Sequence, residues 1–184
     1  MLRGVAGTDS LVLGASGFLG SHVTRQLVER GDTVRVMLRP SSSTRGIDDL
    51  AVRRFCGDIF DGAVLKEAMD GCDVVYYCVV DTRAHLRDSA PLYRTNVEGL
   101  RHVLDAAVNA DLRKFVFTST IGTIGLGNGG VVDEDTPPVN WGGKGGGYIG
   151  SRIAAEQLVL DYSRDRALPA VVLCVSNTYG AGDW

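Results

Sequence analysis

Short apolar runs alternate with longer amphipathic segments along this chain of 184 residues. In the segment Phe18–Arg30, every fourth position from Leu19 to Leu27 is apolar, which predicts a helix with one buried face. The run Val74–Val80 is apolar throughout, as is typical of a strand covered on both faces. The same patterns predict strands at Ser10–Ala15, Thr33–Leu38, Val52–Cys56, Val74–Val80, Lys114–Ser119 and Ala170–Val175. They predict helices at Phe18–Arg30, Asp61–Met69, Ala90–Asn109 and Ser151–Arg164, and a short helical piece near Ile47–Leu50.

This alternation of strands and helices predicts the fold class. Strands joined by helices need right-handed crossover connections, which place the strands in a mostly parallel sheet. With a glycine-rich turn after the first strand, six such strands match the two-halved dinucleotide-binding fold. We therefore expect residues 1–184 to form a single α/β dinucleotide-binding domain, a Rossmann-type doubly wound parallel sheet of about six strands in three α-β-α layers. The long irregular segment Thr120–Gly147 exceeds what a structural connection needs, so we expect it to lie over a site.

Composition narrows the classes of partner. The chain is 45% hydrophobic and 22% charged, which argues against intrinsic disorder, and its net charge of −3 favours neither nucleic acid nor an anionic membrane. No apolar run reaches the length of a membrane span, and the first ten residues lack the apolar stretch of a signal peptide, so we expect a cytoplasmic protein. The cysteines contain no C-x-x-C pair, and we expect buried, unreactive thiols and no metal site. They are Cys56, Cys72, Cys78 and Cys174.

The run Gly14-Ala15-Ser16-Gly17-Phe18-Leu19-Gly20 lies where the first predicted strand passes into the first helix. One glycine permits the tight turn, another lets a pyrophosphate approach the backbone, and the third lets helix and strand pack closely. Free N–H groups and the positive dipole at the helix start then hold the phosphates. No Gly-Lys-Ser/Thr ending follows, which disfavours a mononucleotide P-loop. The expected dinucleotide contacts in this run are Gly14, Ser16, Gly17, Phe18, Leu19 and Gly20.

Two strand ends indicate which dinucleotide binds. An acidic residue after the second strand would hydrogen-bond the ribose hydroxyls of NAD, but Arg39 stands there and hydroxyl side chains follow at positions 41–44. A guanidinium beside hydroxyls suits the 2′-phosphate of NADP, so we expect NADP, with NAD and a solvated loop arginine as the alternatives. After the third strand come Asp58 and Ile59, which we also expect at the cofactor. Asp58 can accept from the adenine amino group, or it can serve as a turn or capping residue.

Further motifs follow in a recognisable order. They are Gly14–Gly20, Gly57-Asp58, Asn96-Val97-Glu98-Gly99, Thr118-Ser119-Thr120, Tyr148-Ile149-Gly150-Ser151-Arg152 and Ser176–Asp183. In this order the chain resembles the extended short-chain dehydrogenase/reductase (SDR) family over nearly its whole length. Other runs look most like the family's branch of dihydroflavonol reductases and hopanoid-associated sugar epimerases. They are Arg39-Pro40, Cys72-Asp73, Tyr93–Val97 and Phe117–Ser119.

The resemblance implies a catalytic set. Tyr148 matches the tyrosine that exchanges a proton with the substrate oxygen, Thr120 matches the hydroxyl that orients that oxygen, and Asn96 matches a helix asparagine of the proton relay. A free tyrosine has a pKa near 10, which nearby cations must lower for this chemistry. Arg152 stands where the family has lysine, and both Tyr148 and Arg152 are expected to contact the cofactor. Arginine keeps the charge but is a poor member of a proton relay, so we expect this replacement to reduce activity. The alternatives are that Tyr148 is an ordinary interface tyrosine and Arg152 a solvated helix residue, and that Thr120 is a strand-end hydroxyl and Asn96 a plain helix residue.

The family also sets expectations for the rest of the protein. Its members carry a smaller C-terminal lobe that forms most of the substrate pocket, and this sequence ends at Trp184, so we expect that lobe to be largely absent, as a truncated product or a reduced module. The helices around Val97–Asn109 and Ser151–Arg164 resemble those that the family uses for dimers, so we expect a homodimer. The leading hypothesis is an NADP(H)-dependent oxidoreductase that acts on a secondary alcohol or ketone, a small-molecule substrate. The alternatives are an NAD-dependent sugar-nucleotide epimerase or dehydratase and a non-catalytic dinucleotide-binding module.

Overall fold

A single parallel sheet organises the computed structural model, which describes residues 7–125, 130–137 and 147–183. Its strands are β1 (Asp9–Leu13), β2 (Thr33–Leu38), β3 (Arg53–Cys56), β4 (Val74–Tyr77), β5 (Lys114–Thr120) and β6 (Ala170–Val175). They lie in the order β3-β2-β1-β4-β5-β6, and every neighbouring pair is parallel. The order reverses between β1 and β4, which is the place where open α/β sheets bind their ligands. The predicted doubly wound sheet is confirmed.

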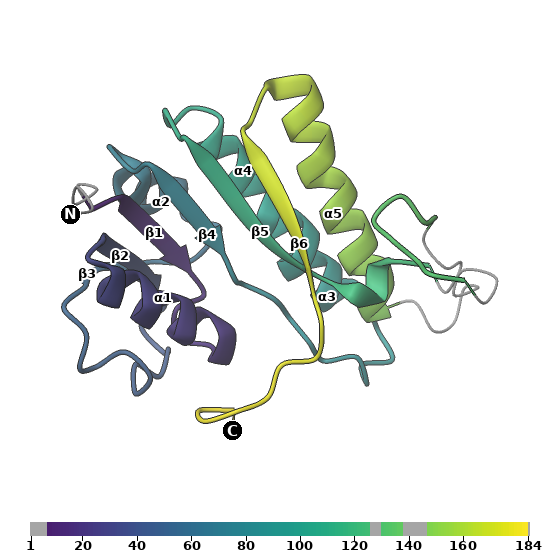
Figure 1. The fold of residues 1–184 in the computed structure, drawn as a ribbon, viewed down its shortest axis with the longest axis horizontal. Coiled ribbons are helices and arrows are strands. Elements are labelled where there is room, and N and C mark those ends of the chain that lie inside the picture. The colour runs from purple at the N-terminus through teal and green to yellow at the C-terminus, as the bar shows by residue number, and fades with distance from the viewer. Residues whose placement is uncertain (1–6, 126–129, 138–146, 184) are drawn as a thin grey trace.

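Helices cover the two faces of this sheet unequally (Figure 1). The helical segments are α1 (Phe18–Arg30), α2 (Gly62–Met69), α3 (Ala90–Tyr93), η1 (Arg94–Gly99), α4 (Leu100–Ala107), η2 (Ile121–Thr123) and α5 (Gly147–Arg166). Helix α1 lies on one face of the sheet, and α2, α4 and α5 lie on the other. Two apolar cores result, one with Val12 of β1 and Leu27 of α1, the other with Leu11 of β1 and Leu104 of α4. Strand β1 is therefore buried on both faces, as a parallel sheet requires.

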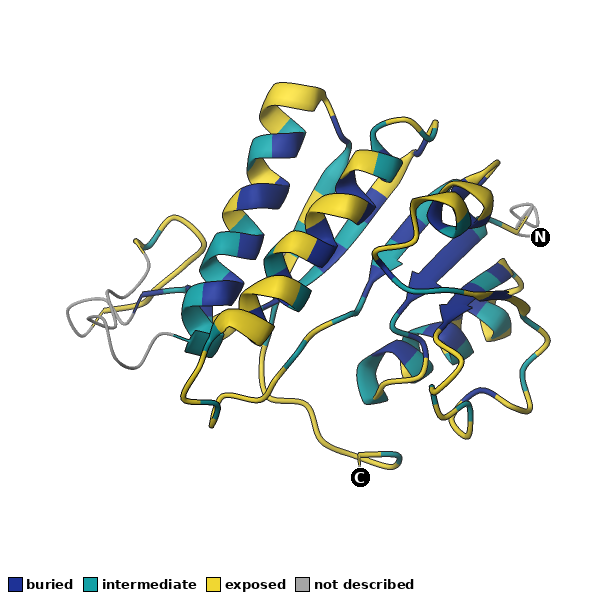
Figure 2. Cartoon of the chain, turned by 180° about the vertical axis from the view of Figure 1, so that it is seen from behind, coloured by how far each residue is buried: buried dark blue, intermediate teal, exposed yellow. Residues whose placement is uncertain are grey.

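The near face of β5 and β6 in Figure 1 is bare, since no helix of the described part of the chain covers it. Val171 and Leu173 of β6 point away from α5 and keep 37% and 46% of their surface exposed. In Figure 2 the opposite face of these strands is hidden behind α4 and α5. The sheet is thus covered on both faces around β1 and on one face at its β6 edge. Among the described helices, none combines the length and the apolar character needed to cross a membrane.

Local signals explain where the helices begin and end. Helix α1 ends at Gly31, whose φ of 90° is left-handed and whose N–H reaches the carbonyls of Leu27 and Val28. Helix α2 begins at Asp61, whose carboxylate accepts from the N–H of Val64 at 3.2 Å. Both boundaries agree with the sequence prediction to within one residue.

Four predicted elements differ from the structure in kind or by three residues or more. Helix α5 begins at Gly147, four residues before the predicted start at Ser151. Strand β4 ends at Tyr77 and not at Val80, because the last three apolar residues leave the sheet. The predicted helix Ala90–Asn109 consists of α3, η1 and α4, and η1 is a π-helical turn. Gly99 at the end of η1 packs closely against Ile59, since a Cβ on Gly99 would lie 2.3 Å from Cδ1 of Ile59. The piece near Ile47–Leu50 is a series of turns, not a helix.

The expectation of buried thiols is wrong for Cys56, which is exposed. It is right for Cys72, where burial raises the pKa of the thiol to about 11. Cys78 and Cys174 are half-buried. Burial raises the pKa of the Cys78 thiol to about 12, so this thiol stays protonated and unreactive at neutral pH.

Gly20 determines how α1 packs against the turn that precedes it. A Cβ at this position would lie 2.1 Å from the carbonyl oxygen of Gly14 and 2.7 Å from its carbonyl carbon. Both of these are backbone atoms, which cannot rotate away as a side chain can. The first turn of α1 therefore rests directly on the glycine turn.

We expect Gly20→Ala to lower the free energy of unfolding by about 2 kcal/mol or more, because the added methyl overpacks a backbone contact. Gly62→Ala is the matched control, since a Cβ there meets nothing within 4 Å in the first turn of α2. That variant should keep or gain stability, by up to about 1 kcal/mol. Urea unfolding of both variants measures the difference. Equal stability would contradict the packing described for Gly20.

Candidate functional site

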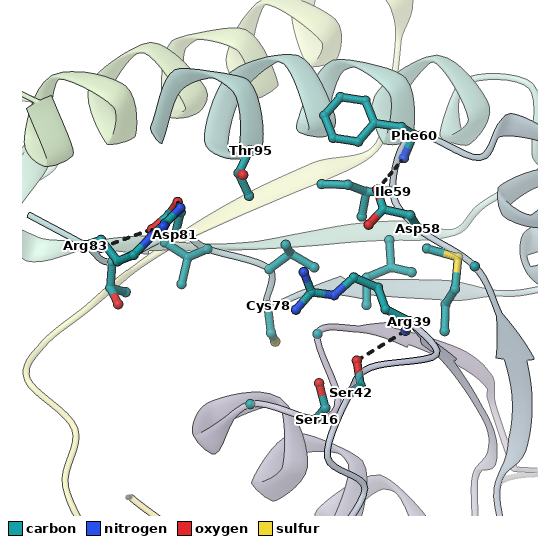
Figure 3. A pocket seen from close by; sticks show the side chains of 18 residues that line it. Ser16, Arg39, Ser42, Asp58, Ile59, Phe60, Cys78, Asp81, Arg83 and Thr95 are labelled. Atoms are coloured by element: carbon teal, nitrogen blue, oxygen red, sulfur yellow. Dashed lines mark hydrogen bonds and ion pairs between the residues drawn. The ribbon is translucent and has the colours of Figure 1, made fainter. Parts of the chain in front are cut away.

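A cavity of about 580 Å³ opens at the carboxyl ends of β1–β4, where the strand order reverses (Figure 3). Its walls are the turn after β1, the segments that follow β2, β3 and β4, and Thr95 of η1. Six of the residues predicted to bind a cofactor line it: Gly14, Ser16, Gly17, Arg39, Asp58 and Ile59. The volume lies within the range of small-molecule and cofactor sites. Residues from four separate strand ends thus meet in one place.

The glycine turn leaves bare backbone on the floor of this cavity. Gly14 has a φ of 87°, and a Cβ there would lie 2.7 Å from the backbone of Cys78. Gly17 donates its N–H to the carbonyl of Gly14 at 3.0 Å and precedes α1 without a side-chain cap. A Cβ on Gly17 would meet only the carbonyl oxygen of Gly14, at 3.4 Å. Neither a Cβ at Gly14 or Gly17 nor a side-chain cap therefore stands at the start of α1, which is the part of a helix that favours anions.

Three other predicted contacts of this turn do not line the cavity. They are Phe18, Leu19 and Gly20, which belong to the first turn of α1. The ring of Phe18 stands edge-on to that of His22, with centroids 5.1 Å apart. These residues belong to the helix that packs against the glycine turn, and they do not face the cavity.

Arg39 extends its guanidinium into the cavity (Figure 3). Its backbone N–H donates to the Ser42 hydroxyl at 3.2 Å, which shapes the chain after β2 and brings a second polar group to the same wall. A charged fork and a hydroxyl on one wall form a suitable site for a phosphate group.

The wall after β3 contains a turn residue and an aromatic ring. Asp58 accepts from the N–H of Phe60 at 3.1 Å through Oδ1, so it is a turn residue, as one of the two sequence interpretations had it. Phe60 lines the cavity, and the guanidinium of Arg94 lies 5.4 Å from its ring centroid. Sequence reasoning missed Phe60, although it directly follows two residues that were predicted.

The segment after β4 adds an ion pair that the sequence did not reveal. The carboxylate of Asp81 receives the guanidinium of Arg83, at 2.9 Å from Nε and 2.5 Å from Nη2. This hydrogen bonding holds the pKa of the Asp81 carboxyl below its usual value. Asp81, Arg83 and Thr95 all line the cavity. The one sequence signal for these residues is their position, since two of them follow β4 and the third lies on the next helical segment.

A second group of predicted residues lies at the start of α5. Asn96 is fully buried in η1, and its side chain joins two elements. Its Oδ1 accepts from the N–H of Asp81 at 2.7 Å, and its Nδ2 donates to the carbonyl of Asp81 at 3.1 Å and to Oγ of Ser151 at 3.0 Å. The Ser151 hydroxyl lies 2.7 Å from the carbonyl oxygen of Tyr148. Asn96 thus connects the cavity wall to the helical turn that carries Tyr148.

Arg152 is almost completely buried, with 2% of its surface exposed. Its Nη2 donates to the carbonyl oxygen of Thr118, and its guanidinium carbon lies 4.9 Å from the ring centroid of Phe117. Among the described residues, Nε and Nη1 of Arg152 and the hydroxyl of Tyr77 have no hydrogen-bond partner. Burial lowers the pKa of the Arg152 guanidinium and raises the pKa of the Tyr77 phenol. A buried cation with so few partners is costly to the fold, which favours a functional reason for it.

Thr120 ends β5 beside the start of α5. Its Oγ1 accepts from the N–H of Gly122 at 3.2 Å, so the hydroxyl proton is free to be donated elsewhere. A Cβ on Gly122 would lie 2.7 Å from Cδ1 of Ile149, the residue after Tyr148. The structure therefore brings the end of β5 and the first turn of α5 into contact. Residues 126–129 and 138–146 lie outside the described residues, so the expectation that Thr120–Gly147 covers a site stays a prediction.

Comparison with known proteins agrees with this geometry. The sequence profile of the NAD dependent epimerase/dehydratase family matches residues 10–183. Sterol demethylase protein B of Methylococcus capsulatus is 34% identical over 125 residues, 68% of this chain and 38% of that protein. The 4-hydroxy-2-methyl-3-oxo-4-farnesyl-3,4-dihydroquinoline-1-oxide ketoreductase of Stigmatella aurantiaca is 33% identical over 179 residues, 95% of this chain and 51% of that protein.

A solved structure is also similar. UDP-glucose 4-epimerase from Brucella ovis in complex with NAD superposes with a TM-score of 0.83 at 26% identity, over 95% of this chain and 54% of that one. This chain spans about half the length of these proteins, or less.

We expect Tyr77→Phe to raise the free energy of unfolding by about 1 kcal/mol, because it removes a buried hydroxyl without a partner. Tyr162→Phe is the control, since the Tyr162 hydroxyl donates to Asp105 at 2.7 Å. The control should lose about 1 kcal/mol. Thermal and urea unfolding measure both variants. If Tyr77→Phe destabilises the protein as much as the control does, the Tyr77 hydroxyl has a partner after all.

Proposed function

This chain belongs to the NAD dependent epimerase/dehydratase family, the extended SDRs, and we propose on that basis that it is an NADP(H)-dependent oxidoreductase acting on a secondary alcohol or ketone. The observation that carries the proposal is the cavity at the switch point, which is lined by the bare backbone of Gly14 and Gly17 and entered by Arg39. A dinucleotide needs such a place for its pyrophosphate, with a specificity group at the end of the second strand.

The residues of the cavity fit this cofactor. No Cβ stands between the cavity and the backbone of Gly14 and Gly17, so a pyrophosphate can reach the N–H groups at the start of α1. Arg39 and Ser42 would hold the 2′-phosphate that distinguishes NADP from NAD. Asp58 uses Oδ1 in its turn, which leaves Oδ2 for the adenine amino group between Ile59 and Phe60.

The group at the start of α5 would provide the proton chemistry. A bound nicotinamide dinucleotide supplies or accepts the hydride. Tyr148 gives a proton to the substrate oxygen or takes one from it, and the Thr120 hydroxyl orients the same oxygen by donating a hydrogen bond to it, without transferring its proton. Arg152 follows Tyr148 by one helical turn, so it places a buried positive charge on the same helix, near the phenol. The contacts of Asn96 support a role in positioning Tyr148, beside the relay that the family resemblance implies.

A sugar-nucleotide epimerase is the second candidate, and the likeness to UDP-glucose 4-epimerase with NAD favours it. An epimerase returns its hydride to the product, so the reduced-nicotinamide absorbance stays constant during turnover. An oxidoreductase changes that absorbance with every turnover. In either case the substrate is a small molecule.

The proposal includes a homodimer that forms through α4 and α5. Leu160 of α5, an exposed apolar residue on this surface, supports it.

Calorimetric titration should show that the protein binds NADPH at least about tenfold more tightly than NADH, because only NADPH has the 2′-phosphate that Arg39 would bind. Arg39→Ala should remove this preference and leave NADH affinity within about twofold. Arg53→Ala is the control, since Arg53 is an exposed arginine of β3 outside the cavity. A wild-type preference for NADH, or equal losses for both nucleotides in Arg39→Ala, would contradict the assignment of NADP.

Tyr148→Phe should lower turnover of a ketone panel with NADPH by at least about 100-fold, because no other group in the set exchanges the proton. Arg152→Lys should lower turnover as well, because lysine cannot both reach the Thr118 carbonyl and lie flat over Phe117. Absorbance of the reduced nicotinamide measures both variants. Full turnover in Tyr148→Phe would refute the catalytic assignment. A large gain in Arg152→Lys would show that the natural site is impaired and favour the non-catalytic module.

A further inference from the structure

Glu156 lies on α5, one turn after Arg152 and two turns after Tyr148. Its side chain reaches back to the sheet, where Oε2 accepts from the Ser119 hydroxyl at 2.5 Å. The same oxygen lies 2.9 Å from Oγ1 of Thr123. Ser119 and Thr123 are both buried, so these bonds form in a shielded place. One carboxylate oxygen of α5 thus contacts a hydroxyl of β5 and a hydroxyl of the following turn η2.

The two hydroxyls stand on either side of Thr120. Oγ1 of Thr123 is also 2.7 Å from the carbonyl oxygen of Thr120, and Oγ1 of Thr120 accepts from the N–H of Gly122. The N–H of Ile124 then closes the turn η2 on the carbonyl of Ile121 at 3.1 Å. The Gly122 bond occupies one acceptor site of the Thr120 hydroxyl, and the other bonds hold the backbone on both sides of Thr120. Glu156 is where this network is attached to α5.

Glu156 also acts on the other half of the catalytic set. Its carboxylate attracts the buried guanidinium of Arg152, which has a hydrogen bond only from Nη2 among the described residues. Negative charge one turn along the helix offsets part of the cost of burying that cation. The same side chain therefore contacts the strand end that carries Thr120 and stabilises the cation that serves Tyr148.

We propose that Glu156 is a positioning residue, which holds the hydroxyl of Thr120 in register with Tyr148 by binding Ser119 and Thr123 to α5. This rests on the proposed function only in so far as Thr120 and Tyr148 share a substrate oxygen. A displacement of about 1 Å in such a pair can cost about 100-fold in rate. None of these residues lines the candidate cofactor cavity at the switch point.

The first test measures the network without any reaction. In hydrogen–deuterium exchange, the amides of Gly122 and Ile124 should exchange at least about tenfold faster in Glu156→Ala than in the wild type. Glu156→Gln keeps a carbonyl oxygen as acceptor and should stay within about threefold of the wild-type rate. Gln157→Ala, an exposed neighbour on α5 whose side chain bonds Asp161, is the matched control and should change nothing in η2. Unchanged exchange of Gly122 and Ile124 in Glu156→Ala would overturn the proposal.

The second test separates positioning from a general structural role. With NADPH and the ketone panel, Glu156→Ala should lower kcat by about 10- to 100-fold and leave KM for NADPH within about twofold, and Glu156→Gln should recover most of kcat. A fall in NADPH affinity equal to the fall in kcat would overturn the proposal. If Glu156→Ala does not fold, Ser119→Ala and Thr123→Val each remove one of the two hydroxyls and should speed η2 exchange in the same way. If the wild type itself binds no nicotinamide nucleotide, the proposed function fails, whereas the exchange test still decides the role of Glu156.

Discussion

The contact of backbone with backbone around Gly14 determines where everything else in the site can lie. The first turn of α1 rests on the Gly14 carbonyl through Gly20, and the Cα of Gly14 presses against the backbone of Cys78 as the chain leaves β4. No side chain fits at either contact, so β1, α1 and β4 approach as closely as polypeptide chains can. Because the strand order reverses at this point, a cavity opens here, and the backbone of Gly14 and Gly17 forms part of its lining. Arg39, Asp58 and Phe60 line that cavity because β2 and β3 stop at the same edge.

Arg152 presents the opposite problem, a charge enclosed by the fold. Its guanidinium is buried against Phe117, with a hydrogen bond to Thr118 and the attraction of Glu156. In general, a core with a neutral side chain of similar volume at such a position is as stable as one with the charge, or more stable. The position therefore makes physical sense if the cation is needed one turn after Tyr148, where its charge acts on the phenol. Burial strengthens that action, since water no longer screens it.

The sequence predicted what depends on local periodicity and missed what depends on distant contacts. The strands and their parallel order were predictable, because each apolar run and each helix carries its own signal. Strand β4 was predicted too long because Cys78, Val79 and Val80 are apolar for another reason, namely that they line the cavity. The residues Asp81 and Arg83 carry no periodic signal, and only the fold brings them to this edge. The role of Glu156 was likewise hidden, since its hydroxyl partners are more than thirty positions away.

The two halves of the candidate site are connected through Asp81 and Asn96. The carboxylate of Asp81 binds Arg83 in the cavity wall, and its backbone is held on both sides by the buried amide of Asn96. Asn96 continues to Ser151, whose hydroxyl contacts the carbonyl of Tyr148. The bonds of Asn96 and Ser151 in this path are buried or partly buried, so breaking one of them leaves a shielded polar group unpaired, which favours a stiff connection. The π-helical turn that carries Asn96 therefore connects the start of α5, with Tyr148, to the wall of the cavity. Glu156 connects the same helix to the end of β5.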